Sequence, residues 1–353
     1  MSSRSRLCEK QRTININDSY HRLYQTLNSQ KLENVGNYHI VKQIGEGSFG
    51  TVYMAIHKLT KTKVVLKSGS KADPNIIREI FFHKQAFHDN ITKLYEVIVT
   101  ETHVYLAIEY CPQGELFDYF ISSECRLNFK DLKNIISQIT AAVFYIHSLN
   151  TAHRDLKLEN ILLDKKYNCK LSDFGFSRDC FKNSCLKTMC GTHVYMAPEL
   201  LLMGDASSNI TSYNGFKIDM WSLGIIFYTL IYGEMPYEDD DEDVVKVKII
   251  NEEPNYELRK IIKKPLMVAV GASPSIVSTI SDTSSCFLET NNNTSGVPEE
   301  AVDLIKMLLQ KDPSARPQTL EAVLKHPFLQ PYGARALKYT NSRLTLTRNF
   351  ENR

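Results

Sequence analysis

One short polar run constrains this chain more than any other feature of its sequence. His153-Arg154-Asp155-Leu156-Lys157-Leu158-Glu159-Asn160 is followed by Asp173-Phe174-Gly175, whose aspartate lies thirteen residues after the asparagine. Phosphoryl transfer from a nucleoside triphosphate needs this inventory: a carboxylate for the attacking hydroxyl, a cation near the phosphoryl group, and an amide plus a second carboxylate for magnesium. The segments Ile161-Leu162-Leu163 and Cys169-Lys170-Leu171 predict two short strands between the motifs.

A glycine-rich segment lies nearer the N-terminus, at Gly45-Glu46-Gly47-Ser48-Phe49-Gly50. Glycine lets backbone N–H groups approach phosphates without an intervening Cβ. A G-x-G-x-x-G pattern also occurs in dinucleotide-binding proteins, where it opens a helix. Here it is followed by Thr51-Val52-Tyr53-Met54-Ala55, which predicts a second strand. The segment therefore predicts a β-hairpin that covers a nucleotide, and it argues against the strand-to-helix turn of a Rossmann fold.

In this order and at this spacing, the motifs resemble those of the eukaryotic serine/threonine protein kinases, most closely the calcium/calmodulin-dependent and Snf1/AMP-activated group. The resemblance covers residues 38–328. It implies an α+β, bilobal fold, with a small antiparallel β-sheet N-lobe (38–111) carrying one main helix and a mainly α-helical C-lobe (112–328). It also implies ATP and Mg²⁺ as cofactors and Ser/Thr hydroxyls of proteins as acceptors.

The resemblance implies a role for each residue of the two polar motifs. Asp155 would orient the substrate hydroxyl, Lys157 would neutralise charge on the γ-phosphoryl group, and Asn160 with Asp173 would hold magnesium. The residues expected to have structural roles are His153, Arg154, Phe174, Arg178, Glu199, Asp219 and Arg316.

The nucleotide-binding residues are likewise implied by the resemblance. Lys67 follows the apolar strand segment 64–66 and would bind the α- and β-phosphates while pairing with Glu79. The other residues expected near the nucleotide are Ile44, Gly45, Glu46, Gly47, Ser48, Phe49, Gly50, Val52, Val65, Ile108, Glu109, Cys111 and Glu115.

Residues 173–199 resemble an activation loop that ends in Ala-Pro-Glu. Thr188 lies at the position of the activating phosphosite, and a phosphate there would add about −1.5 to −2 charges for Arg154 and Arg178 to bind. Thr192, together with Glu159, would form the substrate pocket. The loop also carries three of the eight cysteines, which we interpret as reduced bystander thiols because no Cys-x-x-Cys pair occurs.

Two positions near Lys67 depart from the family pattern. Val65 replaces the usual alanine, and His83 replaces a bulky aliphatic residue one helical turn after Glu79. One hypothesis is that His83 loosens the inward position of this helix, so that activity needs a partner or becomes pH-sensitive. The alternative, which we favour at this point, is that Phe82 or Phe87 fills the gap and His83 merely packs.

Acidic residues suggest a substrate preference. Glu115 and Glu159 occupy positions that bind an upstream arginine in basophilic relatives, whereas Thr229 stands where the most arginine-selective relatives have glutamate. We expect a moderate preference for Arg or Lys upstream of the acceptor. The acidic run 238–243 is interpreted as a solvated helix start, because acidic residues suit helix N-termini.

The remaining segments are predicted to be peripheral. Residues 1–37 form a polar extension, and residues 205–216 form a Ser/Asn-rich addition. The composition of the insert 256–297 predicts disorder. Within this insert, residues 265–270 are either a docking element or a flexible connection. The tail 329–353 is basic at 335–344; a calmodulin-binding or membrane helix is conceivable there, but the Thr-Asn-Ser interruption favours an unstructured tail.

Global properties restrict the class of protein. With 43% hydrophobic residues, 353 residues can form one large catalytic unit, and a net charge of +2 gives no nucleic-acid or membrane signal. We expect a cytoplasmic location, with the nucleus as a second one. Two rivals remain: a pseudokinase scaffold that binds nucleotide without transfer, and a small-molecule or lipid kinase.

Overall fold

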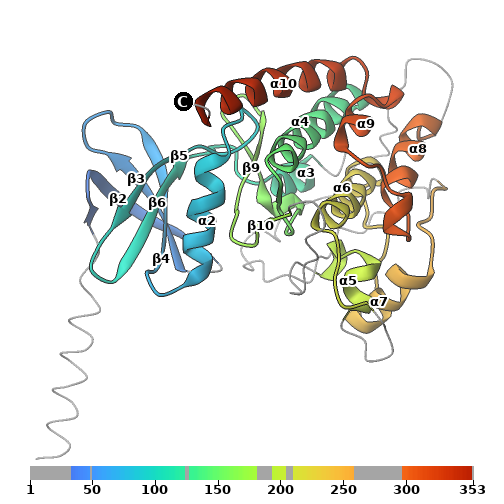
Figure 1. The fold of residues 1–353 in the computed structure, drawn as a ribbon, viewed down its shortest axis with the longest axis horizontal. Helices are drawn as coiled ribbons and strands as arrows, with labels where there is room; N and C mark the ends of the chain where they lie inside the picture. Colours follow the sequence, from blue (N-terminus) through green and yellow to red (C-terminus); the bar gives the residue numbers. More distant parts are fainter. Residues whose placement is uncertain are drawn as a thin grey trace, which may run out of the picture.

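The computed structural model describes residues 33–47, 50–123, 127–180, 193–203, 210–257 and 296–351, and these form two lobes (Figure 1). The N-lobe is a six-stranded antiparallel sheet in the order β1-β2-β3-β4-β6-β5, with one helix, α2, beside it. The elements are β1 Asn34–Val35, β2 Tyr38–Gly47, β3 Gly50–His57, β4 Lys63–Ser70, α2 Pro74–Gln85, β5 Leu94–Val99 and β6 His103–Glu109. The predicted N-lobe architecture is confirmed, although β1 begins inside the segment that we assigned to the polar extension.

Local sequence explains how α2 is placed. The side chain of Asp73 accepts a hydrogen bond from Asn75 N, and Pro74 occupies the first turn, where its missing N–H costs nothing. Ile76 is fully buried against the sheet, whereas Ile77 and Phe81 remain about half exposed. The helix therefore has one face fixed to the sheet and its two ends set by the adjoining loops.

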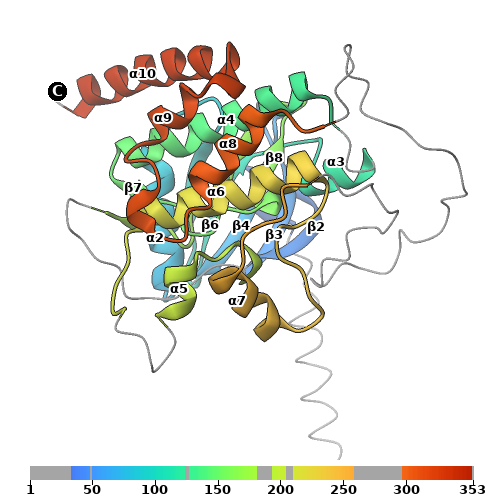
Figure 2. The same ribbon diagram turned by 90° about the vertical axis from the view of Figure 1, so that its right-hand side faces the viewer.

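The C-lobe is mainly helical, and α6 lies at its centre, packed against α4 and α8 (Figure 2). Nearly every α6 residue is buried, which explains why this stretch is apolar on all sides. The helices are α3 Leu116–Ser122, α4 Phe129–Ser148, α5 Pro198–Leu202, α6 Gly215–Tyr232, α7 Glu242–Asn251, α8 Glu299–Leu308, α9 Leu320–Leu324 and α10 Tyr332–Glu351. Two short ribbons pair β7 Thr151–Ala152 with β10 Arg178–Asp179, and β8 Ile161–Leu163 with β9 Cys169–Leu171.

The central helix α6 begins at Gly215, one turn before Asp219, and the side chain of Asn214 accepts from Phe216 N. Tyr213, just before it, is 4% exposed. The C-terminal part of the proposed 205–216 addition is therefore integral to the lobe.

The prediction of an unstructured tail was wrong. Residues 332–351 form α10, which packs against α4 and α9 and runs across the C-lobe with its C-terminal end directed toward the N-lobe (Figure 1). Leu337, Thr340 and Leu344 recur at helical spacing and are buried. The Thr-Asn-Ser interruption does not end the helix, because Thr340 lies on the buried face with its hydroxyl bonded to Ala336 O, 2.9 Å away.

Several predicted features lie outside the described residues: Ser48, Phe49, Thr188, Thr192 and most of the insert, 258–295. At the edge of that insert, Tyr256 packs edge-on against Tyr228, with ring centroids 6.3 Å apart. None of the described helices is long and apolar enough to cross a membrane.

Candidate active site

The catalytic loop brings three predicted residues into direct contact. Asn160 Nδ2 donates to the Asp155 backbone carbonyl at 2.7 Å and to Asp155 Oδ2 at 2.9 Å. Lys157 Nζ lies 3.3 Å from the same Oδ2. The carboxylate is thus held between an amide donor and a cation, and the loop ends directly in strand β8.

The backbone of this loop is fixed by a buried carboxylate on α6. Asp219 accepts from His153 N and Arg154 N, both at 2.8 Å, and from His147 Nε2 at 2.7 Å. Arg154 has φ 71°, a left-handed conformation that is unfavourable for residues other than glycine. Because Asp219 is fully buried, its bonds to successive N–H groups hold this conformation in place.

A charge cluster joins two residues of the N-lobe to Asp173 of the C-lobe. Lys67 Nζ on β4 lies 2.9 Å from Glu79 Oε1 on α2 and 3.0 Å from Asp173 Oδ1 beyond β9. Burial lowers the pKa of Lys67, but Glu79 and Asp173 outweigh it, so the net shift is upward. Burial also opposes ionisation of Asp173, yet the charge and hydrogen bond of Lys67 hold its pKa below the ordinary value. Burial raises the pKa of Glu79 to about 7, because Lys67 offsets only part of the cost.

The donor set fits a magnesium ion held together with nucleotide phosphates. Magnesium prefers oxygen ligands and commonly takes only one or two carboxylates from the protein. Asp173 supplies a carboxylate that stays ionised, and the amide nitrogen of Asn160 is committed to Asp155, which leaves the amide oxygen as the group for a cation. No cluster of three His, Cys, Asp or Glu residues suited to a metal occurs among the described residues. Magnesium bound by Asp173 and Asn160 would take its remaining ligands from nucleotide phosphates and water.

His83 packs inward and contacts Phe174 directly, with ring centroids 4.9 Å apart. His153 contacts the same ring from another side at 5.3 Å. His83 Nε2 bonds to Thr92 O at 2.6 Å, and burial lowers the His83 pKa to about 4, so the ring is neutral. Our expectation that His83 merely packs agrees with this geometry. Phe87 does not fill the gap, however, because it is 62% exposed.

The other residues predicted to bind nucleotide lie on strands of the N-lobe sheet and on the segment that follows β6. Val65 pairs with Ile108 on β6 and with Met54 on β3. Gly50 has φ 156°, and a Cβ there would lie 2.4 Å from Ser68 O, so the end of the hairpin requires glycine. The remaining nucleotide candidates in the described residues lie on β2, β3, β6 and the connector that follows: Ile44, Gly45, Glu46, Gly47, Val52, Glu109, Cys111 and Glu115.

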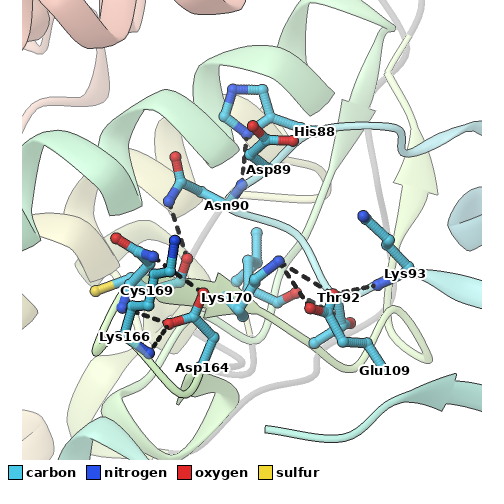
Figure 3. A network of polar contacts seen from close by, with 12 residues as sticks. His88, Asp89, Asn90, Thr92, Lys93, Glu109, Asp164, Lys166, Cys169 and Lys170 are labelled. Carbon is cyan, nitrogen blue, oxygen red and sulfur yellow. Dashed lines mark hydrogen bonds and ion pairs between the residues drawn. The ribbon is translucent and has the colours of Figure 1, made fainter. Parts of the chain in front are cut away.

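The connector itself is tied to the C-lobe. Glu109 bonds to Lys170 Nζ on β9 at 3.0 Å and accepts from Lys93 N at 3.2 Å (Figure 3). Burial, with a smaller contribution from Glu109, raises the pKa of Cys111 to about 12, so its thiol stays protonated.

Glu115 and Glu159, the two acidic residues predicted to bind substrate, lie near enough for their charges to interact. Glu115 precedes α3, and Glu159 lies in the catalytic loop. Burial raises the pKa of Glu115 to about 7, and the charges of Asp118 and Glu159 add to the shift. Thr229 is unsuited to binding a substrate arginine, because it is fully buried and bonds to Ile225 O at 2.9 Å.

The segment after the activation loop is anchored by a buried ion pair. Arg316 Nη1 and Nη2 lie 2.7 and 2.8 Å from the two carboxylate oxygens of Glu199.

Sequence reasoning missed two residues that support the catalytic loop. Tyr213 accepts a hydrogen bond from Arg154, and His147 bonds to Asp219. Neither carries a local sequence signal, since each partner lies more than fifty residues away.

Comparisons with known proteins identify the family of this chain. Residues 38–329 match the protein kinase domain family. YPL150W of Saccharomyces cerevisiae, provisionally named a serine/threonine-protein kinase, is 48% identical over 95% of this chain. Serine/threonine-protein kinase ppk16 of Schizosaccharomyces pombe is 42% identical over 92% of it. The serine/threonine-protein kinase SIK3 homolog of Danio rerio is 38% identical over 62% of this chain and 18% of its own length.

The chain therefore belongs to the protein kinase family, and its relatives are of the eukaryotic serine/threonine class. It spans 32% of the length of the budding-yeast relative and 42% of the fission-yeast relative. Helix α10 lies beyond the residues that match the family domain.

Proposed function

We propose that this chain transfers the γ-phosphoryl group of Mg-ATP to serine or threonine hydroxyls of protein substrates. The observation that carries the proposal is the meeting of two constellations: Asp155 with Lys157 and Asn160, and Lys67 with Glu79 and Asp173. Phosphoryl transfer needs positioning and charge stabilisation more than covalent help from the protein, and these groups supply both.

Each group has a distinct task. Asp155 accepts the proton of the substrate hydroxyl, whose oxygen bonds to the γ-phosphorus while the bond to the β–γ bridging oxygen breaks and ADP leaves. Lys157, 3.3 Å from Asp155, neutralises charge on the transferred group. Lys67 holds the α- and β-phosphates. Magnesium, held by Asp173 and Asn160 when bound, would offset charge on the phosphates.

Regulation and substrate choice are finer parts of the proposal. Phosphorylation of Thr188 by this or an upstream kinase would activate the enzyme, with Arg154 and Arg178 as binding partners for the phosphate. Glu115 and Glu159 favour substrates with Arg or Lys upstream of the acceptor. The enzyme would act in the cytoplasm or the nucleus.

The test is incubation of the purified chain with radiolabelled Mg-ATP and basic Ser/Thr peptides, beside an Asp173→Ala variant. Transfer by the wild type alone supports the proposal, and mass spectrometry shows whether Thr188 carries label. Nucleotide binding without transfer, even after treatment with an upstream kinase, would favour a pseudokinase scaffold. Labelling of soluble metabolites or lipids instead of peptides would favour a small-molecule kinase.

A further inference from the structure

The loop that joins α2 to β5, residues 86–93, is held by contacts from three directions. On the α2 side, His83 bonds to Thr92 O. On the β9 side, Leu171 N donates to Asn90 O at 2.8 Å, and Thr92 N donates to Leu171 O at 3.0 Å. Leu171 precedes Asp173 by two residues, and α2 carries Glu79. The 86–93 loop is therefore bonded to both elements that supply the carboxylates of the Lys67 charge cluster.

The third direction is α10, from which Thr340 reaches the loop. Thr340 Oγ1 lies 3.0 Å from His88 Nε2, and both residues are buried. The hydroxyl proton of Thr340 is donated to Ala336 O, so the oxygen accepts from His88 Nε2–H. His88 Nδ1 is then an acceptor, and Asn90 N donates to it at 3.0 Å. Burial lowers the pKa of His88 to about 4, which keeps the ring in this neutral form.

Asn90 links His88 to strand β9, which precedes Asp173. Asn90 Nδ2 donates to Cys169 O at 3.0 Å and to Gln138 Oε1 at 2.9 Å, so Asn90 lies between His88 and β9 (Figure 3). Two further contacts support the loop from α10. Arg343 lies 3.3 Å from Asp89, and Thr347 bonds at 3.0 Å to Tyr145 Oη, which accepts from Phe87 N.

We propose that α10 is a positioning element for phosphoryl transfer, in which Thr340, through His88, fixes the 86–93 loop and thereby holds α2 and Glu79 in register with Lys67 and Asp173. This inference rests on the proposed kinase function. It assigns a catalytic consequence to a helix that lies outside the matched kinase domain. Thr340 touches neither nucleotide nor substrate, and it acts only through the elements it holds.

Helix α10 offers a matched pair of threonines for the test. Thr340 and Thr345 both bond to the carbonyl four residues earlier, at 2.9 and 3.0 Å, but Thr345 is exposed and does not touch the loop. Thr340→Val removes the acceptor for His88 at nearly constant volume, Thr340→Ser restores it, and Thr345→Val controls for the change in helix propensity. Each variant of the full chain is assayed for kcat, for KM with ATP and peptide, and for hydrogen exchange of residues 76–93.

We expect Thr340→Val to speed exchange in the loop and α2 about tenfold, since the loss of one buried hydrogen bond shifts an opening equilibrium by that order. It should raise the KM for ATP and lower kcat several-fold while leaving the KM for peptide unchanged; Thr340→Ser should recover both. Equal kinetics and exchange in Thr340→Val, Thr345→Val and wild type would overturn the inference. So would a fall in Tm without any change in ATP KM, which would show a purely structural role.

A second variant keeps the test decisive if Thr340→Val does not fold. Arg343→Met leaves the Thr340–His88 bond in place and removes the charge of Arg343, which pairs with Asp89, bonds to Tyr339 Oη and lies over the Phe87 ring; it should give a smaller increase in exchange confined to the same residues. Hydrogen exchange does not depend on catalysis. If the wild type transfers no phosphate even after treatment with an upstream kinase, the proposed function fails, whereas the exchange data still decide whether α10 holds α2.

Discussion

The two halves of the active site are held by different means. In the C-lobe, Asp155 lies on a loop whose backbone is bonded to Asp219, a carboxylate buried in the central helix. In the other half, called here the N-lobe half, Lys67 on β4 and Glu79 on α2 meet Asp173, which follows β9 of the C-lobe, through their side chains. The first half is fixed as soon as the lobe folds, whereas the second depends on where α2 lies. A shift of α2 is therefore expected to disturb the N-lobe half more than the C-lobe half.

The largest effect should follow from breaking the C-lobe half. Asp219→Ala leaves the N–H groups of His153 and Arg154 buried without their acceptor. Each such group costs about 1–3 kcal/mol, so the free energy of unfolding should fall by about 2–6 kcal/mol. Urea denaturation measures this change. Asp219→Asn, which keeps one acceptor oxygen, should lose less, and equal stability of Asp219→Ala and wild type would contradict the bracing role.

Removal of the N-lobe cation should damage chemistry more than folding. Lys67→Met should lower kcat/KM about 10²–10³-fold, which is the usual consequence of losing one preorganised charge-stabilising group. Stability should change less than in Asp219→Ala, because Glu79, with its pKa already raised to about 7, can take up a proton once Lys67 is gone. Steady-state kinetics and thermal melting of the two variants, measured side by side, test the contrast. If Lys67→Met unfolded as readily as Asp219→Ala, the proposed difference between the two halves of the site would be wrong.

The substrate side should show a pH effect of intermediate size. Because burial raises the pKa of Glu115 to about 7, its carboxylate forms mainly above that pH. Binding of an arginine-containing peptide should therefore weaken as pH falls from 8 to 6. Glu115→Gln should raise the peptide KM about five- to tenfold at pH 8 and lose most of this dependence. A peptide with alanine in place of the arginine is the control, and a flat wild-type profile would refute the assignment.

The sequence predicted the chemistry of the site better than the tertiary contacts that support it. Asp155, Lys157 and Asn160 could be assigned because phosphoryl transfer demands those residue types at short spacing, and Asp173 follows closely. Helix α10 could not be predicted from local pattern, because Thr340 becomes a favourable helix residue only through burial against His88, 252 positions away. Tyr213 was missed for the same reason, since its partner Arg154 lies 59 positions earlier.

The smallest effect at neutral pH is expected at His83, which packs between α2 and Phe174. His83→Leu gives up the bond to Thr92 O but also removes a buried Nδ1 that has no partner among the described residues. These changes oppose each other, so the free energy of unfolding at pH 7.5 should change by less than about 1.5 kcal/mol.

Acid should separate the variant from the wild type. The folded-state pKa of His83 is lowered to about 4, below its ordinary value of 6.5, so its contribution to stability is present above pH 6.5 and is lost as pH falls toward 4. A shift of this size amounts to about 3 kcal/mol. His88 is lowered to a similar value and remains in the variant, so His83→Leu should lose roughly half as much stability as the wild type over this range. Urea denaturation at pH 7.5, 6 and 5 measures the difference.

Unchanged activity and an unchanged pH profile of kcat/KM in His83→Leu would show that the histidine packs without regulating α2. A shifted profile would make it a pH-sensitive part of the N-lobe half.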